Sequence, residues 1–359
     1  MLRINNSKML KKAKNTILPF FIPMQGCPHQ CIYCDQTAIS GYKQGPDQAD
    51  IAEAVARCDH DIPELAFYGG SFSALPKQKQ EQYLSFAQPY LADGRIKSIR
   101  ISTRPDYIDE QELDFLAAYG VNTIELGIQS FSDQVLRASG RGYDSDTAKR
   151  AAHLILEKGF ILGLQLMTGL PQDDIKQSLF SAREAVKIRP AMVRIYPTLV
   201  LRHTPLALLY ENGQYRPQTV EEAVRVCRDM AAIFALADIP VIRIGINPSA
   251  DVEAALLEGP YDAAFGHLVR SALKKQQLIT AITLAGFWPQ DIYIPKRQLP
   301  ESIGHHKSNK LWLQEKSGQR PRFHADDKLS ENAIAIAKDS QKFVLSYKEF
   351  LQIYEKTMP

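Results

Sequence analysis

The segment Gly26-Cys27-Pro28-His29-Gln30-Cys31-Ile32-Tyr33-Cys34-Asp35 holds three of the five cysteines of this chain within eight residues. Its spacing, C-x3-C-x2-C, directs three thiolates toward one metal centre from a short loop that contains a proline. A structural zinc site normally has four ligands and favours paired C-x-x-C arms. A cuboidal iron–sulfur cluster is held by cysteine thiolates, and three of them would leave one iron for a ligand from outside the protein. The spacing therefore favours an iron–sulfur cluster.

Other interpretations of the three cysteines remain open on this segment alone. Disulfides are disfavoured because Cys58 and Cys227 are the only other cysteines and the total is odd. His29 could complete a zinc knuckle as a fourth ligand, although such a site would be crowded. The bland alternative is a chance cluster of buried thiols.

Length and composition exclude several classes of protein. The chain has 359 residues, of which 45% are hydrophobic and 23% charged, as in an ordinary globular protein. No apolar run approaches the length of a membrane span, and the net charge of +3 by itself makes no case for nucleic acid. Residues 1–20 are basic and free of acids, as in a transit peptide, but Thr16–Met24 reads as a first strand, which leaves little to remove. We expect a cytoplasmic protein with reduced cysteines.

Short β-rich runs alternate with amphipathic helical stretches from residue 16 to about 245. This alternation predicts βα units around a parallel sheet. Six or seven such units predict an α/β fold, a partial or full (β/α) TIM-like barrel over residues 1–245, and residues 246–359 are expected to form a small C-terminal α+β domain. The predicted strands are Ile17–Met24, Glu64–Tyr68, Ile96–Ser102, Val121–Ile128, Ile161–Met167, Met192–Tyr196 and Val241–Ile244. The predicted helices are Ile51–Cys58, Lys79–Leu91, Asp109–Tyr119, Asp144–Lys158, Asp173–Lys187 and Val220–Ala237.

Each strand carries one apolar face and one face with polar side chains, because side chains alternate along a strand. A barrel surrounded by helices needs an apolar outer face, so the polar set should point inward, where buried charges need partners. We expect a polar lumen that holds a ligand; the alternative is a helix-covered open sheet with internal ion pairs. The polar set consists of Arg100, Ser102, Arg104, Thr123, Glu125, Gln129, Gln165, Arg194, Tyr196 and Arg243.

Distinct motifs stand at the ends of successive strands, where active sites of βα-barrels gather. They are Tyr68-Gly69-Gly70-Ser71, Ser102-Thr103-Arg104-Pro105-Asp106, Glu125–Phe131, Gln165–Pro171 and Arg194-Ile195-Tyr196-Pro197-Thr198-Leu199-Val200. With the cysteine motif they resemble the radical SAM superfamily, in the branch shared by the catalytic subunit of Elongator and the oxygen-independent coproporphyrinogen dehydrogenases. The Thr-Arg-Pro-Asp and Tyr-Pro-Thr-Leu-Val strings resemble the Elongator side.

This resemblance implies a cofactor site. By it, Cys27, Cys31 and Cys34 bind a 4Fe–4S cluster whose free iron chelates the amino and carboxylate groups of S-adenosylmethionine (SAM). The remaining implied contacts to SAM are Tyr33 near the adenine; Gly69, Gly70 and Ser71 at the methionine moiety; Gln129, Arg141 and Gln165 at the ribose and carboxylate; and Ser102 and Arg104 at the end of their strand. Ser102 replaces a Glu, and Gln165 an Asp, found in many relatives, so both positions keep hydrogen-bonding capacity but lose charge.

The resemblance also implies a reaction. A reduced cluster passes one electron to SAM, giving methionine and a 5′-deoxyadenosyl radical that takes a hydrogen atom from a substrate in the lumen. Glu125, Arg194 and Tyr196, with Arg243, are the candidates for shaping the substrate side. A flavodoxin or ferredoxin type of protein is the expected single-electron donor.

The C-terminal third distinguishes the possible substrates. No Gly-rich acetyl-CoA loop follows Gly245, so acetyl-CoA is not expected, and the segment Glu258–Gly266 resembles the small C-terminal domain of stand-alone radical SAM proteins. Residues 296–328 hold eight Lys or Arg against four acids, which could form a footprint for tRNA or a solvated surface. A tetrapyrrole or other small molecule is an alternative substrate, disfavoured because Asp35 follows Cys34 where those enzymes tend to have a further cysteine. A non-catalytic barrel with a structural cluster or zinc is the remaining alternative.

Overall fold

The computed structural model describes residues 17–23, 27, 31–42, 44–58 and 62–359. These residues belong to two compact units. The first unit comprises Met1–Pro28, Gln36–Gly127 and Arg150–Leu162, and the second comprises His29–Asp35, Ile128–Lys149 and Gly163–Pro359. The predicted boundary between residues 245 and 246 is a different division and stays a prediction.

The first unit contains the strands of the N-terminal βα repeats. Its strands pair in parallel, β1 with β2, β2 with β3 and β3 with β4. The strands are β1 (Ile17–Ile22), β2 (Ile62–Gly69), β3 (Ile96–Thr103) and β4 (Val121–Gln129, whose last two residues belong to the second unit). The helices are α1 (Gln36–Ser40), α2 (Gln48–Ala56), α3 (Lys77–Ala92), α4 (Glu110–Ala118) and α6 (Ser145–Glu157, shared with the second unit), with short 3-10 turns at Phe72–Ala74 and Pro105–Tyr107.

Local sequence explains where these elements begin and what they bury. The Asp109 carboxylate accepts a hydrogen bond from the Glu112 N–H at 2.7 Å and so caps α4. Ile99 and Ile101 of β3 are fully buried, as is Leu113 of α4. The alternating apolar residues of the strands and the apolar faces of the helices thus form the core of this unit.

The second unit continues the repeats. Within it β5 pairs in parallel with β6, and β6 with β8. The strands are β5 (Ile161–Thr168, whose first two residues belong to the first unit), β6 (Met192–Pro197), β8 (Val241–Ile244) and an antiparallel pair of short strands, β7 (Val200–Leu201) with β9 (Leu256–Glu258). The helices are α5 (Asp133–Ala138), α7 (Ile175–Ile188), α8 (Pro205–Glu211), α9 (Val220–Leu236) and α10 (Ala250–Ala255).

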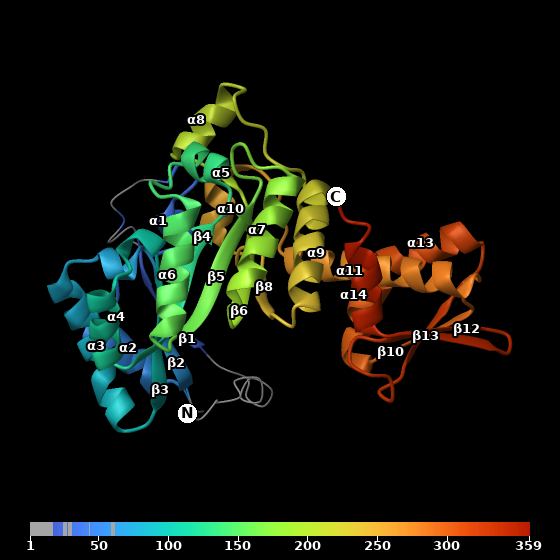
Figure 1. Cartoon of the computed structure of the whole chain (residues 1–359), viewed down its shortest axis with the longest axis horizontal. Helices are drawn as coiled ribbons and strands as arrows, with labels where there is room; N and C mark the ends of the chain where they lie inside the picture. Colours follow the sequence, from blue (N-terminus) through green and yellow to red (C-terminus); the bar gives the residue numbers. More distant parts are fainter. Residues whose placement is uncertain (1–16, 24–26, 28–30, 43, 59–61) are drawn as a thin grey trace. The chain divides into compact units, whose positions relative to one another are not determined.

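Seven of the strands form one sheet in the order β1-β2-β3-β4-β5-β6-β8 (Figure 1). Strand order follows chain order, with helices between successive strands, as in a partial TIM-like barrel. The prediction of this α/β class is confirmed, and each predicted strand and helix is present within a few residues of its expected bounds.

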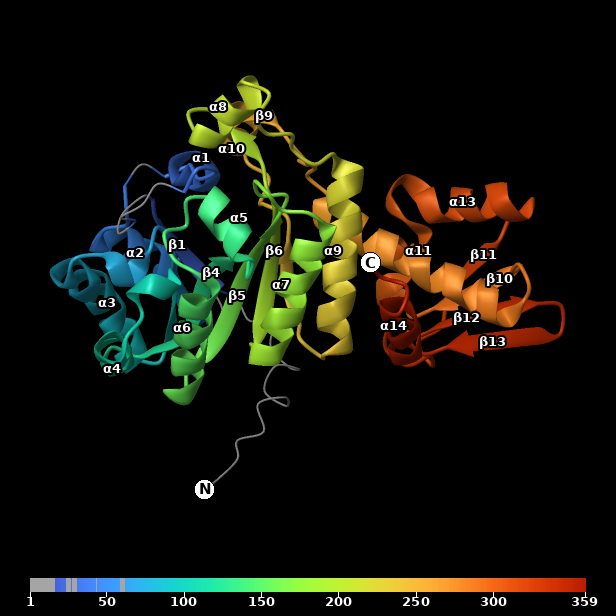
Figure 2. The ribbon, with the colours of Figure 1, turned by 45° about the horizontal axis from the view of Figure 1, so that its top comes forward.

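The chain ends in a mixed four-stranded sheet packed on helices, which confirms the expected α+β character of this region (Figure 2). The sheet order is β11-β10-β12-β13. Its elements are α11 (Phe265–Ala285), β10 (Asp291–Ile294), α12 (Leu299–Ile303), α13 (Ser308–Ser317), β11 (Arg322–Ala325), β12 (Ile334–Lys338), β13 (Gln341–Leu345) and α14 (Tyr347–Glu355), with 3-10 turns at Lys296–Gln298 and His305–Lys307.

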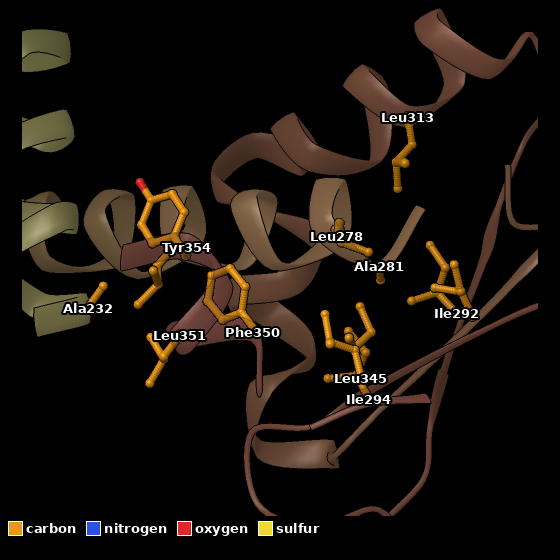
Figure 3. Close-up of a cluster of buried hydrophobic side chains, with 13 residues drawn as sticks. Ala232, Leu278, Ala281, Ile292, Ile294, Leu313, Leu345, Phe350, Leu351 and Tyr354 are labelled. Carbon is orange, nitrogen blue, oxygen red and sulfur yellow. The ribbon is translucent and has the colours of Figure 1, made fainter. Parts of the chain in front are cut away.

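One face of this small sheet forms an apolar core with the helices (Figure 3). Ile292, Ile294 and Leu345 from the strands pack with Leu278 of α11 and Phe350 of α14. Trp288 and Trp312 pack against the same cluster. The cluster also includes Ala232, which belongs to α9. Among the described residues, no helix combines the length and the apolar character that crossing a membrane would require.

Candidate active site

The Gly-Gly turn at the end of β2 holds the end of β1. Gly69 has φ +110°, and a Cβ there would lie 2.8 Å from the carbonyl oxygen of Ile22. The N–H of Gly70 donates to the same oxygen at 2.8 Å. Ile22 is the last residue of the strand that leads toward the cysteine loop. The glycine at position 69 is therefore required by contact between two backbone segments, whereas the sequence suggested only close approach to a ligand.

A cluster of buried hydroxyl groups ties this turn to the end of β3. Ser71 Oγ lies 2.9 Å from Thr103 Oγ1 and accepts a hydrogen bond from the Arg104 N–H at 3.2 Å. The Arg104 guanidinium is buried and donates to Asp106 at 2.9 and 2.8 Å. These bonds fix the backbone around Ser71 and Arg104, and the predicted SAM contacts of both residues remain predictions.

The polar face of β2, β3 and β4 is filled by an ion-pair network. Arg100 donates from Nη1 to Glu125 Oε1 at 2.6 Å and from Nε to Glu64 Oε2 at 2.9 Å. Thr123 Oγ1 donates to Glu64, and Tyr68 donates to Glu125 at 3.0 Å. Burial disfavours the charged guanidinium, but the Glu125 and Glu64 carboxylates outweigh this effect and raise the pKa of Arg100.

This network bears on two expectations from the sequence. The polar side chains of the first unit do share one face, as strand alternation predicts. In this unit, however, the polar side chains form ion pairs with one another, as Arg100 does with Glu64 and Glu125. This arrangement corresponds to the alternative expectation of internal ion pairs. Glu125 is 1% exposed and bonded to Arg100 and Tyr68, so it has a structural role, and its proposed role at the substrate stays a prediction.

In the second unit, Arg141 lies against the cysteine loop. Its Nη1 is 3.0 Å from Cys31 Sγ and 3.1 Å from the Tyr33 hydroxyl, and its Nε and Nη2 donate to the Tyr143 hydroxyl at 3.0 and 2.7 Å. Burial disfavours its charge, yet the neighbouring Tyr143, Tyr33 and Cys31 raise the pKa of Arg141 well above its ordinary value. Burial likewise raises the pKa of Tyr33, against the lowering effect of Arg141. A buried cation beside Cys31 favours negative charge on the sulfur.

Backbone hydrogen bonds hold the turn from Cys31 to Cys34. The Cys34 N–H donates to the Cys31 carbonyl at 3.0 Å. The N–H of Ile32 donates to Ser139 O at 3.3 Å, and the N–H of Leu206 donates to Ile32 O at 2.8 Å. Cys31 is buried and Cys34 half-buried. The loop that carries two of the three predicted ligands is thus built into the apolar packing of this unit.

The remaining predicted residues of the second unit lie on a partly open polar face. Gln165 of β5 is the cross-strand neighbour of Arg194 of β6, which is the neighbour of Arg243 of β8. These three side chains and Tyr196 are half-buried, whereas the alternating apolar residues of β5 and β6 are buried. Burial and the like charge of Arg194 lower the pKa of Arg243, against the effect of Tyr196. This face therefore has positive charge and solvent access.

Gln129, at the end of β4, has φ +72°. A residue with a Cβ is disfavoured in the left-handed region, and such strain is frequent at functional sites. Gln129 is also almost buried, at 9% exposure. The backbone thus marks the position where the resemblance implies a SAM contact, although the contact itself stays a prediction.

Two residues of this region escaped sequence reasoning. Tyr143 accepts hydrogen bonds from Arg141 and donates to the Ile128 carbonyl at 3.0 Å, so it fixes the guanidinium to the end of β4. Asp173, after β5, accepts from the Gly169 N–H at 2.8 Å and from Ser178 Oγ at 2.7 Å. Burial raises the pKa of Asp173 to about 7, although these hydrogen bonds oppose it. The one sequence signal for a functional role of Tyr143 and Asp173 is that each residue follows a predicted strand.

A small hollow lies beyond the ends of β6 and β8. Tyr261 and Asp262, which form part of its wall, come from the Glu258–Gly266 segment that the sequence singled out. The full lining is Pro197, Leu199, Gly245, Ile246, Pro260, Tyr261, Asp262 and Phe265.

The donor set around the cysteine loop fits an iron–sulfur cluster in its chemistry. Cys31 and Cys34 offer sulfur atoms from one tight turn, and Arg141 supports negative charge on the first of them. Cys27, in the first unit, is half-buried. Within the described part of the chain, no group of three His, Cys, Asp or Glu residues is arranged to hold a metal ion, so ligation by the three cysteines stays a prediction.

Comparison with known families decides the affiliation of the chain. A model of the radical SAM superfamily matches residues 21–181, and a model of the radical SAM C-terminal domain matches residues 190–275. The chain belongs to the radical SAM superfamily. The family implies SAM and a 4Fe–4S cluster as cofactors, and its first match includes the complete cysteine motif.

Relatives of this radical SAM chain include Elongator-type proteins. It is 31% identical to the tRNA uridine(34) acetyltransferase of Methanocaldococcus jannaschii over 205 residues, which are 52% of this chain and 38% of that protein. It is 28% identical to Elongator complex protein 3 of Mus musculus over 207 residues, covering 51% and 37% of the two chains. The chain thus spans well under half the length of these relatives.

A solved structure supports the fold. The archaeal Elp3 of Methanocaldococcus infernus, with an N-terminal deletion, superposes with a TM-score of 0.58 at 20% identity, covering 79% of this chain and 69% of that one. This likeness concerns the architecture alone. It agrees with the partial TIM-like barrel described above.

Proposed function

We propose that this chain is a radical SAM enzyme whose substrate is tRNA. The observation that carries the proposal is the buried Arg141 guanidinium, 3.0 Å from Cys31 Sγ on the C-x3-C-x2-C loop. Membership of the radical SAM superfamily supports the cofactor part. The similarity to a tRNA uridine(34) acetyltransferase supports the substrate part.

The cysteines Cys27, Cys31 and Cys34 would hold the 4Fe–4S cluster. When bound, the cluster and SAM supply a 5′-deoxyadenosyl radical for hydrogen abstraction. The residues of this chain would bind SAM and orient it. The proposed SAM contacts are Tyr33, Gly69, Gly70, Ser71, Ser102, Arg104, Gln129, Arg141 and Gln165.

Arg141 would provide two functions in this assignment. Its charge stabilises the sulfur of Cys31, and its remaining donors are aligned by Tyr143. A guanidinium presents several N–H groups in a fixed fork that matches a carboxylate. Arg141 is therefore suited to the amino-acid end of SAM, next to the cluster loop.

The partly open face of β5, β6 and β8 would receive the substrate. Arg194 and Arg243 are adjacent in register, and their like charges favour an anionic ligand. The phosphates of tRNA are such anions. Tyr196, which lies opposite Met167 on β5, would contact the reacting nucleoside, and Glu125 would keep the neighbouring strands in place.

The remaining parts of the proposal concern partners and compartment. A flavodoxin or ferredoxin type of protein would donate the single electron, and the cytoplasm would supply both the donor and a reducing environment. The proposal does not require acetyl-CoA.

The experiment is anaerobic reconstitution of the cluster, reduction with dithionite and chromatographic assay for 5′-deoxyadenosine, with and without bulk tRNA. Cys31→Ala should abolish iron uptake and deoxyadenosine, whereas Cys58→Ala, outside the motif, should change neither. Faster deoxyadenosine formation with tRNA than with an equal mass of ribosomal RNA supports the substrate. Deoxyadenosine formation that does not respond to tRNA would remove tRNA from the proposal, and zinc in place of iron would overturn it entirely.

A further inference from the structure

The small C-terminal sheet has a second face that its core does not use. Ile292, Ile294, Ile336 and Leu345 point into the apolar cluster with α11 and α14. Because side chains alternate along a strand, the residues between them lie on the opposite face. Figure 2 shows α11 and α13 on one side of the sheet, and on the opposite face Arg322, Lys342 and Val344 are exposed.

Aromatic rings occupy the centre of this open face. Tyr293 of β10 and His324 of β11 are cross-strand neighbours, and their rings stack with centroids 5.0 Å apart and an interplanar angle of 24°. The next strand places the small Ala335 beside Tyr293, followed by Val344 of β13, which is 50% exposed. Ala335 is buried and Tyr293 is half-buried.

Cationic side chains surround the rings. Lys342 Nζ lies 4.9 Å from the centroid of the Tyr293 ring. Lys342 comes from β13 and His324 from β11, on opposite sides of β10 in the sheet order. The second face of the Tyr293 ring is therefore covered by a flexible, exposed lysine. Such a cover can be displaced by another ring, which would stack on Tyr293 while the ammonium group moves to a nearby anion.

One carboxylate lies among these groups and orients them. Asp291 contacts Arg322 at 2.7 Å and His324 Nε2 at 2.6 Å. The hydrogen bond from Arg322 has the largest effect on the pKa of Asp291 and lowers it, and the hydrogen bond from His324 lowers it further. The Arg322 side chain remains 69% exposed. The face thus carries Arg322 and Lys342 against Asp291, within a region in which Lys and Arg outnumber acids.

We propose that this face, formed by Tyr293, His324, Arg322, Lys342 and Val344, binds single-stranded RNA. An unpaired base stacks on Tyr293 in place of Lys342, and Arg322 and Lys342 bind the flanking phosphates. Four-stranded sheets that stack bases on exposed aromatic residues are a recurring solution for RNA. A protein partner would be expected to need a larger apolar surface than Val344 provides. The inference rests on the proposed RNA substrate and assigns it a second contact surface.

The test is fluorescence anisotropy with the full-length, anaerobically reconstituted chain. The probes are a fluorescein-labelled 12-nucleotide oligouridine and the same strand paired with oligoadenine. The parent should prefer the single strand. Tyr293→Leu should weaken single-strand binding roughly ten-fold or more, since stacking contributes about that factor per base, and Tyr293→Phe should restore it.

A matched pair of lysine variants separates phosphate contact from general charge. Lys342→Gln should reduce the slope of log affinity against log salt by about 0.7, the value for one phosphate of a single strand. Lys348→Gln, an equal loss of charge on α14, should leave the slope unchanged. Far-UV circular dichroism and the thermal midpoint verify that each variant is folded.

Each outcome decides between the proposals. Equal affinity of the parent and Tyr293→Leu for the single strand, or preference for the duplex, overturns the role of this face but leaves tRNA as substrate. A parent that forms deoxyadenosine yet binds neither probe nor tRNA overturns this inference and the tRNA substrate together, while the radical SAM reaction stands. Capture of a protein instead of RNA at this face, lost on Val344→Glu, also overturns it.

Discussion

Arg100→Met tests the buried ion-pair network of the first unit. The Arg100 side chain is 5% exposed, and its partners Glu64 and Glu125 are 10% and 1% exposed. Methionine has a similar length and fits an apolar site, so the main change is the loss of the guanidinium. Two carboxylates then remain buried without the cation that lies 2.6 Å from Glu125 and 2.9 Å from Glu64.

The expected loss of stability is about 3–5 kcal/mol, the usual effect of removing one member of a buried pair. Glu125→Gln should cost less, about 1.5–3 kcal/mol, because Arg100 keeps Glu64 and a neutral acceptor replaces the second carboxylate. The double variant should be more stable than the sum of the single effects predicts, by about 0.5–3 kcal/mol, because only one buried carboxylate remains.

The assay must report on the first unit. Hydrogen exchange of β3 and β4 in urea, measured by mass spectrometry, follows this unit directly. Fluorescence of Trp288 and Trp312, whose rings lie 6.1 Å apart in the C-terminal cluster, provides an internal reference. The reasoning would be refuted if the free energy of opening of β3 and β4 in Arg100→Met were within 1 kcal/mol of the parent value. Strictly additive stability losses in the double variant would refute it as well.

Three further predictions concern single sites. Gly69→Ala should destabilise the junction of β1 and β2 by roughly 1–3 kcal/mol in urea unfolding, and more than Gly94→Ala, which has φ +78° but nothing within 4 Å of the added Cβ; equal losses would exclude the close approach to Ile22 as the cause. Arg141→Lys keeps the charge but loses the fork, so SAM binding measured by equilibrium dialysis should weaken roughly ten-fold or more at unchanged iron content, and unchanged affinity would contradict the assignment. Asp173→Asn should flatten the pH dependence of the thermal midpoint: the folded-state pKa is raised from 3.8 to about 7, so its contribution to stability is full below pH 4 and is lost as pH rises through 7, at roughly 1.4 kcal/mol per pKa unit. A parallel slope between pH 4 and 7 in the parent and the Asn variant would show that Asp173 titrates normally.

Periodic patterns in the sequence were sufficient to predict the strands and helices of the barrel. Val121–Ile128 was expected as a strand and β4 is Val121–Gln129, while Asp109, expected at the start of a helix, caps α4. The short strands β7 and β9 could not be predicted, because their pairing joins Val200 to Glu258 and leaves no local pattern. The same limit applied to the C-terminal sheet, which the sequence predicted only as α+β.

The site was predictable in its residues but not in their partners. Alternation placed Arg100 and Glu125 on one face, yet the bond between them depends on the register of β3 against β4, which two separate stretches of sequence do not contain. Similarly, the resemblance to the radical SAM superfamily implied a role for Arg141, whereas its alignment by Tyr143 depends on a hydrogen bond to the end of β4. The predicted division at residue 245 and the individual roles of the site residues stay predictions.

The contacts of helix α9 with the C-terminal region affect any attempt to express the barrel without that region. Ala232 of this helix belongs to the C-terminal apolar cluster, and Asp229 accepts hydrogen bonds from Arg228 at 2.8 Å and from the hydroxyl of Tyr354, in the last helix, at 2.5 Å. A gene fragment that stops at residue 245 would therefore encode α9 with its apolar face exposed to solvent. Asp229 would also lose the hydrogen bond from the Tyr354 hydroxyl. Such a fragment would be expected to aggregate on expression, and exchange of the C-terminal region between homologues would require matching substitutions in α9.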